Sequence, residues 1–107
     1  MRTLLRASKR LILPVALLMA SAAALAASRE ADFKRAYAAA QAAEERAGSL
    51  RNQWTVTETS LAEARRAASE GDFERAIAAA REAEALAKAS IYQATHEEEA
   101  WKDLEIR

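Results

Sequence analysis

The sequence predicts an all-α protein, folded as an antiparallel helical hairpin or a small three-helix bundle. One apolar seam has members spaced alternately by three and four residues, which places them on one face of a helix. This seam stops at Gly71-Asp72 and then resumes with the same spacing. The composition agrees, because 30% of the residues are charged and only one is proline, as expected for helices with one solvated face.

The two halves of the seam have mostly small residues and could pack against each other if the chain folds back at Gly71. Such a narrow hairpin encloses little volume for a substrate, so the pattern favours a binding protein over an enzyme. The seam comprises Phe33, Ala36, Ala40, Ala43, Ala47, Leu50, Trp54, Thr57, Leu61, Ala64 and Ala68, and then Phe73, Ala76, Ala80, Ala83, Ala87, Ser90, Ala94, Glu97, Trp101 and Leu104.

The first 26 residues have the pattern of a secretory signal peptide. A basic start precedes the apolar run 11–25, and Ala24-Leu25-Ala26 is a small-x-small site that predicts cleavage after Ala26. The apolar run is shorter than the ~20 residues that span a bilayer. We therefore expect a single periplasmic helical domain, residues 27–107, that is not held in a membrane after cleavage. The basic residues of the start are Arg2, Arg6, Lys9 and Arg10.

Cleavage changes the net charge of the protein. The whole chain has 16 basic and 16 acidic residues. Four of the basic residues and none of the acidic ones lie in the predicted signal, so the mature domain has 12 against 16 and a net charge of −4. Nucleic acid is not expected as a partner, because binding it requires a basic surface. A basic patch on a protein is the more natural complement.

The chain contains no cysteine, which excludes disulfides, a lipoprotein anchor, covalent c-type haem and thiolate metal sites. Alanine supplies 23 of the 81 mature residues, and a buried alanine removes little apolar area from water. A domain this small is only marginally stable. We expect it to be completed by a partner or by self-association.

Two architectures are open for the segment before the turn. The seam keeps its phase through Gly48-Ser49, so one possibility is a single helix over about 30–70. The other is a pair of helices broken near 48–53, which gives three helices in all. We favour an interruption near Gly48, because Thr55, Thr57 and Thr59 also lower helix propensity there.

Gly71-Asp72 is the clearest boundary. Glycine after a helix supplies the left-handed conformation that ends it, and aspartate caps the helix that follows. A helix from Asp72 to about Leu104 is predicted, antiparallel to the one before the turn. This arrangement sets Ala64 near Ala80 and Leu61 near Ala83.

No motif for catalysis or for a cofactor is present. His96 is the only histidine, and a metal site needs three or four convergent ligands, so we expect an exposed side chain. Carboxylate pairs such as Glu44-Glu45 lie on helices that should be open to solvent. The mature chain has two isolated glycines, Gly48 and Gly71, and no phosphate-binding loop.

The two tryptophans have two interpretations. Trp54 and Trp101 both belong to the seam, which favours a place in the core. An alanine-rich bundle is too thin to enclose two indoles completely, however, and a partly exposed tryptophan is a typical anchor at a protein interface.

The stretch from Gln53 to Trp101 resembles the SoxXA-binding protein family, small exported proteins of bacterial sulfur oxidation. The matching pattern is Trp54-x-x-Thr57, Leu61-x-x-Ala64, Ala68-x-x-Gly71-Asp72-Phe73-x-x-Ala76-Ile77, Ala80-x-x-Ala83 and Tyr92-Gln93-Ala94. The resemblance implies a periplasmic accessory protein, without haem, that promotes a thiosulfate-oxidising c-type cytochrome complex. The sequence departs from the family at Gln53 and Thr55-Val56, where an acidic residue and Arg-Asp are usual.

We therefore expect a non-enzymatic docking protein without cofactor or metal. Its partner-binding residues would be Trp54, Thr57, Gln93 and Trp101, with charged flanks that steer association. Two other classes are open: a structural envelope protein that forms homo-oligomers through alanine zippers, and a tetratricopeptide-like periplasmic adaptor that binds peptides.

Overall fold

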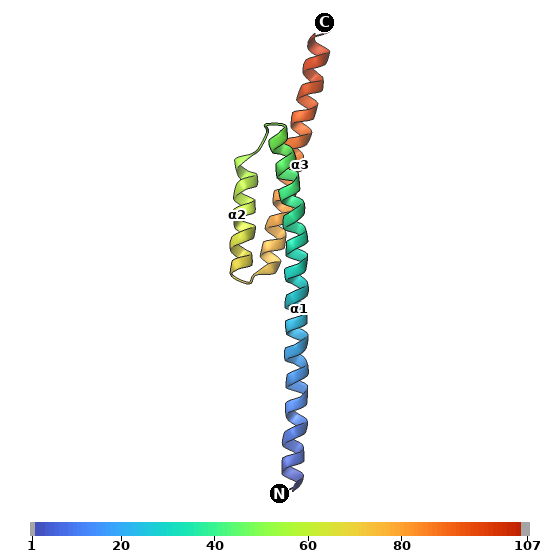
Figure 1. The fold of residues 1–107 in the computed structure, drawn as a ribbon, viewed down its shortest axis with the longest axis vertical. Coiled ribbons are helices and arrows are strands. Elements are labelled where there is room, and N and C mark those ends of the chain that lie inside the picture. The colour runs from blue at the N-terminus through green and yellow to red at the C-terminus, as the bar shows by residue number, and fades with distance from the viewer. Residues whose placement is uncertain (1, 106–107) are drawn as a thin grey trace.

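Three helices make up the computed structural model, which describes the backbone of residues 2–105 and the side chains of residues 19 and 21–105. They are α1 (Arg2–Ser49), α2 (Thr55–Ser69) and α3 (Phe73–Glu105). The second half of α1 runs beside α3 in the same direction, and α2 returns antiparallel to both (Figure 1). The predicted all-α fold, a helical hairpin within a three-helix bundle, is confirmed.

The predicted break between two helices is confirmed, because α1 ends at Ser49 and α2 begins at Thr55. Gly48, near which the break was predicted, is not the residue at which the chain turns. Gly48 remains helical, and the chain turns at Arg51, which has a φ of 55°. The amide of Asn52 donates to the carbonyl of Ala47 (3.0 Å) and the amide of Arg51 to that of Gly48 (3.0 Å). These two bonds form a Schellman motif, in which the left-handed position is normally glycine.

The turn between α2 and α3 is also a Schellman motif, and here glycine occupies the left-handed position. Gly71 has a φ of 78°, and the amide of Asp72 donates to the carbonyl of Ala67 (2.9 Å). The Asp72 carboxylate then accepts from the amide of Arg75 at 3.3 Å. The predicted stop and cap are both confirmed.

Small residues on the three facing stripes form the core. Leu61 is buried with Ala83 and with Ala40 of α1, and Ala64 is buried with Ala79 and Ala80. The predicted neighbours Leu61–Ala83 and Ala64–Ala80 are therefore confirmed. Phe33, Ala36 and Tyr37 of α1 pack against the second cluster.

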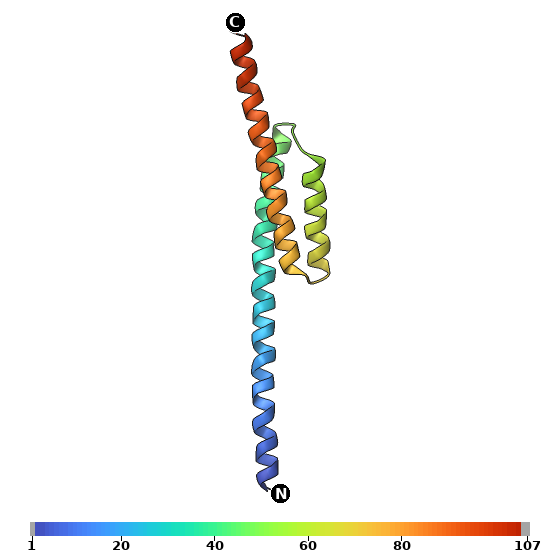
Figure 2. The ribbon, with the colours of Figure 1, turned by 180° about the vertical axis from the view of Figure 1, so that it is seen from behind.

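The prediction that the seam of α3 is buried as far as Leu104 is wrong. Its last buried residue is Ser90, and Trp101 and Leu104 are 67% and 65% exposed. The reason is length: α1 ends at Ser49 and α2 begins at Thr55, so neither reaches the rest of α3. Residues 91–105, the free segment of α3, extend beyond the bundle (Figure 2).

The molecule is correspondingly slender, with principal extents of 96 × 20 × 14 Å. Over the residues whose side chains are described, no helix is both long enough and apolar enough to cross a membrane. The predicted signal sequence forms the first part of α1, and most of its side chains lie outside the described residues.

Candidate functional site

The loop between α1 and α2 is tied to α3 by one side chain. Nδ2 of Asn52 donates to the backbone carbonyl of Ser90 at 2.7 Å and lies 3.5 Å from Oε1 of Gln93. Gln93 in turn donates from Nε2 to Oε1 of Glu97 at 3.2 Å. This chain of contacts fixes the position of the loop where the free segment of α3 begins.

The four predicted partner-binding residues do not share one surface. Trp54 is half-buried at the start of α2, and Gln93 is exposed beside the same loop. Trp101 lies on the free segment, about 12 Å further along the axis of α3. Thr57 is fully buried, so its side chain cannot contact a partner without rearrangement of α2.

His96 lies on the free segment and is exposed, as the sequence predicts. Its ring stacks on Tyr92 with 3.7 Å between the ring centroids, and Nδ1 is 3.0 Å from the Tyr92 carbonyl. The residues with described side chains contain no group of three or more His, Asp or Glu side chains that could hold a metal ion.

A polar groove of about 220 Å³ lies between α1 and α2. Leu61 forms its apolar part, and Nη1 of Arg65 donates to Oη of Tyr37 at 2.7 Å on one wall. On the α1 side, Nε2 of Gln53 donates to the backbone carbonyl of Glu44 at 3.3 Å. Its lining residues are Tyr37, Gln41, Glu44, Glu45, Gln53, Glu58, Leu61 and Arg65.

Glu44 is the unusual residue of this groove. It is only 5% exposed, and no described side chain or backbone group donates a hydrogen bond to either carboxylate oxygen. Burial raises the pKa of Glu44 above its ordinary 4.5, and the negative charge of the neighbouring Glu58 carboxylate raises it further.

The prediction that the Glu44-Glu45 pair lies on open helix surface is wrong for Glu44, which is buried, and correct for Glu45. Glu44 follows Ala40 by four residues and precedes Ala47 by three, the spacing of the seam. Ala43, which the seam includes, fits the same spacing but is only half-buried. A carboxylate at a seam position is a sign of a buried polar site.

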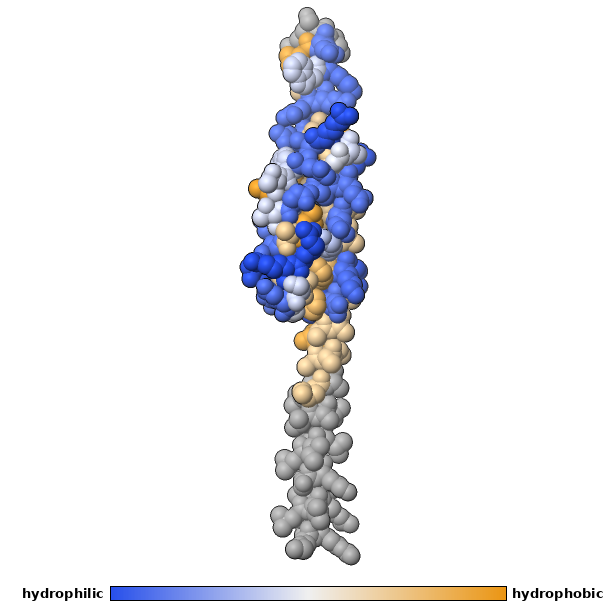
Figure 3. All heavy atoms as spheres, turned by 60° about the vertical axis from the view of Figure 1, so that its left-hand side comes forward, coloured by the Kyte–Doolittle hydropathy of each residue, from blue (hydrophilic) through white to orange (hydrophobic). Residues whose placement is uncertain are grey.

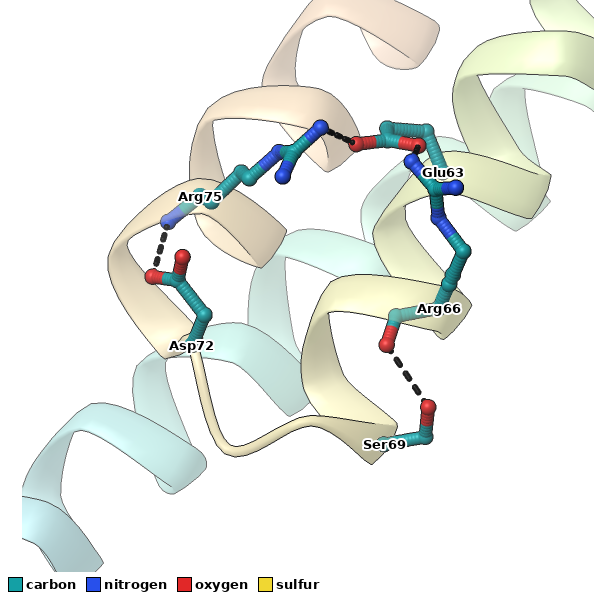
Figure 4. A network of polar contacts seen from close by, with 5 residues as sticks. All are labelled: Glu63, Arg66, Ser69, Asp72 and Arg75. Carbon is teal, nitrogen blue, oxygen red and sulfur yellow. Dashed lines mark hydrogen bonds and ion pairs between the residues drawn. The ribbon is translucent and has the colours of Figure 1, made fainter.

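At the opposite end of α2, a network of charged side chains surrounds the Gly71 turn (Figure 4). The Glu63 carboxylate pairs with Arg66 on its own helix and with Arg75 on α3, each at 2.5 Å. These side chains are 29% to 61% exposed, so the network contributes little to stability. We assign it a structural role.

The outer surface of the bundle is mainly hydrophilic on the side shown in Figure 3, where apolar side chains gather in a narrow strip along the bundle and on α1 beyond it. Large exposed apolar side chains elsewhere are few among the described residues. They include Val56 on α2, and Tyr92, Trp101 and Leu104 on the free segment.

In comparisons with known proteins, no family model matches the chain, and no curated protein or solved structure is significantly similar to it.

Proposed function

We propose that residues 27–107 form an exported accessory protein, without catalytic activity, that docks on a periplasmic c-type cytochrome complex and promotes thiosulfate oxidation. The observation that carries the docking function is the free segment of α3. It projects from the bundle with Tyr92, Trp101 and Leu104 more than 60% exposed. Large apolar side chains on a projecting helix are typical of protein interfaces.

The identity of the partner depends on the resemblance of residues 53–101 to the SoxXA-binding family. Within that stretch, Trp54 lies at the end of the bundle from which the free segment projects, and Gln93 lies at the beginning of that segment, next to Asn52. A partner that contacts Trp101 could therefore also reach both. Thr57 is buried in α2 and is not part of the proposed contact.

Export agrees with the packing of α1. The Arg29–Glu74 ion pair, 3.2 Å long, and the contact of Phe33 with Phe73, 6.2 Å between ring centroids, both lie after Ala26. Cleavage at the predicted site would keep these contacts between α1 and α3 in the mature domain.

The proposed mechanism is selective binding. The acidic mature domain would be steered to a basic patch on the cytochrome complex, and the free segment would then anchor it. Docking can activate the complex only if the protein binds its competent conformation more tightly than the others. Without cysteine, the accessory protein carries no covalently attached c-type haem.

The test is co-purification from cells grown on thiosulfate, with the tagged protein expressed at its natural level. We expect a c-type cytochrome in the eluate, visible by its haem absorption. Trp101→Ala should reduce its recovery strongly. Val56→Ala, which removes an exposed apolar side chain from α2, should not. Recovery of a different partner, with no cytochrome, would remove the assignment.

A further inference from the structure

The geometry points to a second contact within this docking function: the groove between α1 and α2 binds one basic side chain, lysine or arginine, of the protein partner. The inference rests on the proposed function for the existence of such a partner. It assigns a ligand to residues that lie outside the free segment of α3.

The first argument is the state of Glu44. Glu44 lines the groove and is only 5% exposed in the free protein, and no donor among the described residues reaches its carboxylate. A buried charge without a donor is unfavourable. An ammonium or guanidinium group in the groove would supply both the hydrogen bonds and the opposite charge.

The second argument is the charge of the lining. Glu44, Glu45 and Glu58 face a single cation, Arg65. The Arg65 guanidinium is engaged with the Tyr37 hydroxyl at 2.7 Å, and among the described residues it makes no ion pair with any of the three carboxylates. An external cation therefore meets an excess of negative charge.

The third argument is size and shape. A volume of about 220 Å³ is below the ~300–1,000 Å³ of sites for small molecules, yet it admits the end of one side chain. Tyr37 and Leu61 offer an aromatic ring and an apolar surface to an alkyl stem, as basic side chains require. The described carboxylates do not form a metal-binding group of three, so an organic cation is the better match.

The test uses the mature protein labelled with ¹⁵N and three capped amino acids: Nα-acetyl-lysine methylamide, Nα-acetyl-arginine methylamide, and the uncharged Nα-acetyl-norleucine methylamide. We expect saturable, millimolar binding of at least one of the two cations, with amide shifts centred on residues 41–58. Norleucine should produce none. Glu44→Gln should weaken the binding by about tenfold.

Glu82→Gln is the matched control, because Glu82 is exposed on α3 and does not line the groove. It should bind the cation as the wild type does. If neither cation shifts residues 41–58, or if Glu44→Gln binds as well as the wild type, the groove proposal is wrong.

The same variants separate this proposal from the docking function. If Glu44→Gln and the wild type recover the cytochrome equally well, the groove is not part of the interface although the docking function stands. If the capped cations bind but no cytochrome is recovered, the groove proposal stands as a binding site and the proposed partner is wrong.

Discussion

Asn52 and Ser90 are joined by a hydrogen bond of 2.7 Å from the Asn52 side chain to the Ser90 backbone carbonyl. This bond connects the loop after α1 to the last buried residue of α3. We expect Asn52→Ala to lower the free energy of unfolding by about 1–2 kcal/mol, because it leaves a part-buried carbonyl without this donor. Urea denaturation measures the change. Arg81→Ala, on the exposed side of α3, should stay within about 0.5 kcal/mol of the wild type.

Arg51 adopts a left-handed conformation, with φ at 55°, that costs a residue with a side chain about 1–2 kcal/mol. Glycine adopts it without that cost. We therefore expect Arg51→Gly to raise the free energy of unfolding by up to about 1 kcal/mol in thermal or urea denaturation. The same substitution at Arg81, within a helix, should lower it by about 1 kcal/mol. A loss of stability at position 51 would contradict this interpretation.

Gly71 gives the reverse experiment. A Cβ atom there meets nothing within 4 Å, and φ is +78°, so Gly71→Ala changes the backbone strain and no contact. We expect a loss of about 1 kcal/mol in the free energy of unfolding. Gly71→Asn should cost less, because asparagine tolerates this conformation better than alanine. Equal losses for both variants would show that strain at φ is not the cause.

Glu44 makes stability depend on pH. Its pKa is raised in the folded protein, so folding favours the protonated form. The contribution of Glu44 to stability is therefore fully present below the ordinary pKa of 4.5, and it is lost as pH rises through the raised value. The groups that face Glu44 in the groove are Glu45, Glu58 and Arg65.

Glu44→Gln should remove this dependence. The amide is neutral and can donate to the Glu58 carboxylate, so we expect a gain of about 1 kcal/mol at pH 7 and a much smaller one at pH 4. Urea denaturation at the two pH values measures the difference, with Glu82→Gln as the control. An equal effect at both pH values would contradict a titrating Glu44.

Trp101 should matter for binding and not for folding. Its side chain is 67% exposed on the free segment of α3, where neither α1 nor α2 packs. Trp101→Ala should therefore change the free energy of unfolding by less than about 0.5 kcal/mol. Leu61→Ala, a core change, should cost about 2–5 kcal/mol. A large effect of Trp101→Ala in the isolated protein would mean that a second molecule covers the free segment, and light scattering would then detect the oligomer.

Local signals predicted most of the fold. The Gly71-Asp72 turn and the pairing of Leu61 with Ala83 follow from glycine conformation and helix periodicity, which are short-range properties. Arg51 could not be identified in this way. Its left-handed backbone is held by the Schellman hydrogen bonds and by the Asn52 contact with α3. Arginine at position 51 gives no local signal for this conformation, because the residue usually found there is glycine.

The candidate site was predicted less well, for a related reason. Spacing places Trp101 and Thr57 on the same seam, but which of them is buried depends on how far the neighbouring helices extend. Thr57 lies within the three-helix part of the molecule and is covered, whereas Trp101 lies beyond the ends of both neighbours of α3. Spacing by three and four residues is equally compatible with Ala43 and Glu44 at the buried position. Which of the two is buried depends on how α2 packs against α1.

The alanines between the helices have a consequence for how this sequence can diverge. Ala40, Ala64, Ala80 and Ala83 have no exposed surface, so adding even one methyl group there would push two backbones apart. Substitutions should accumulate instead on the outward sides of the bundle. Distant homologues would then be recognisable by where their smallest residues fall along the three helices.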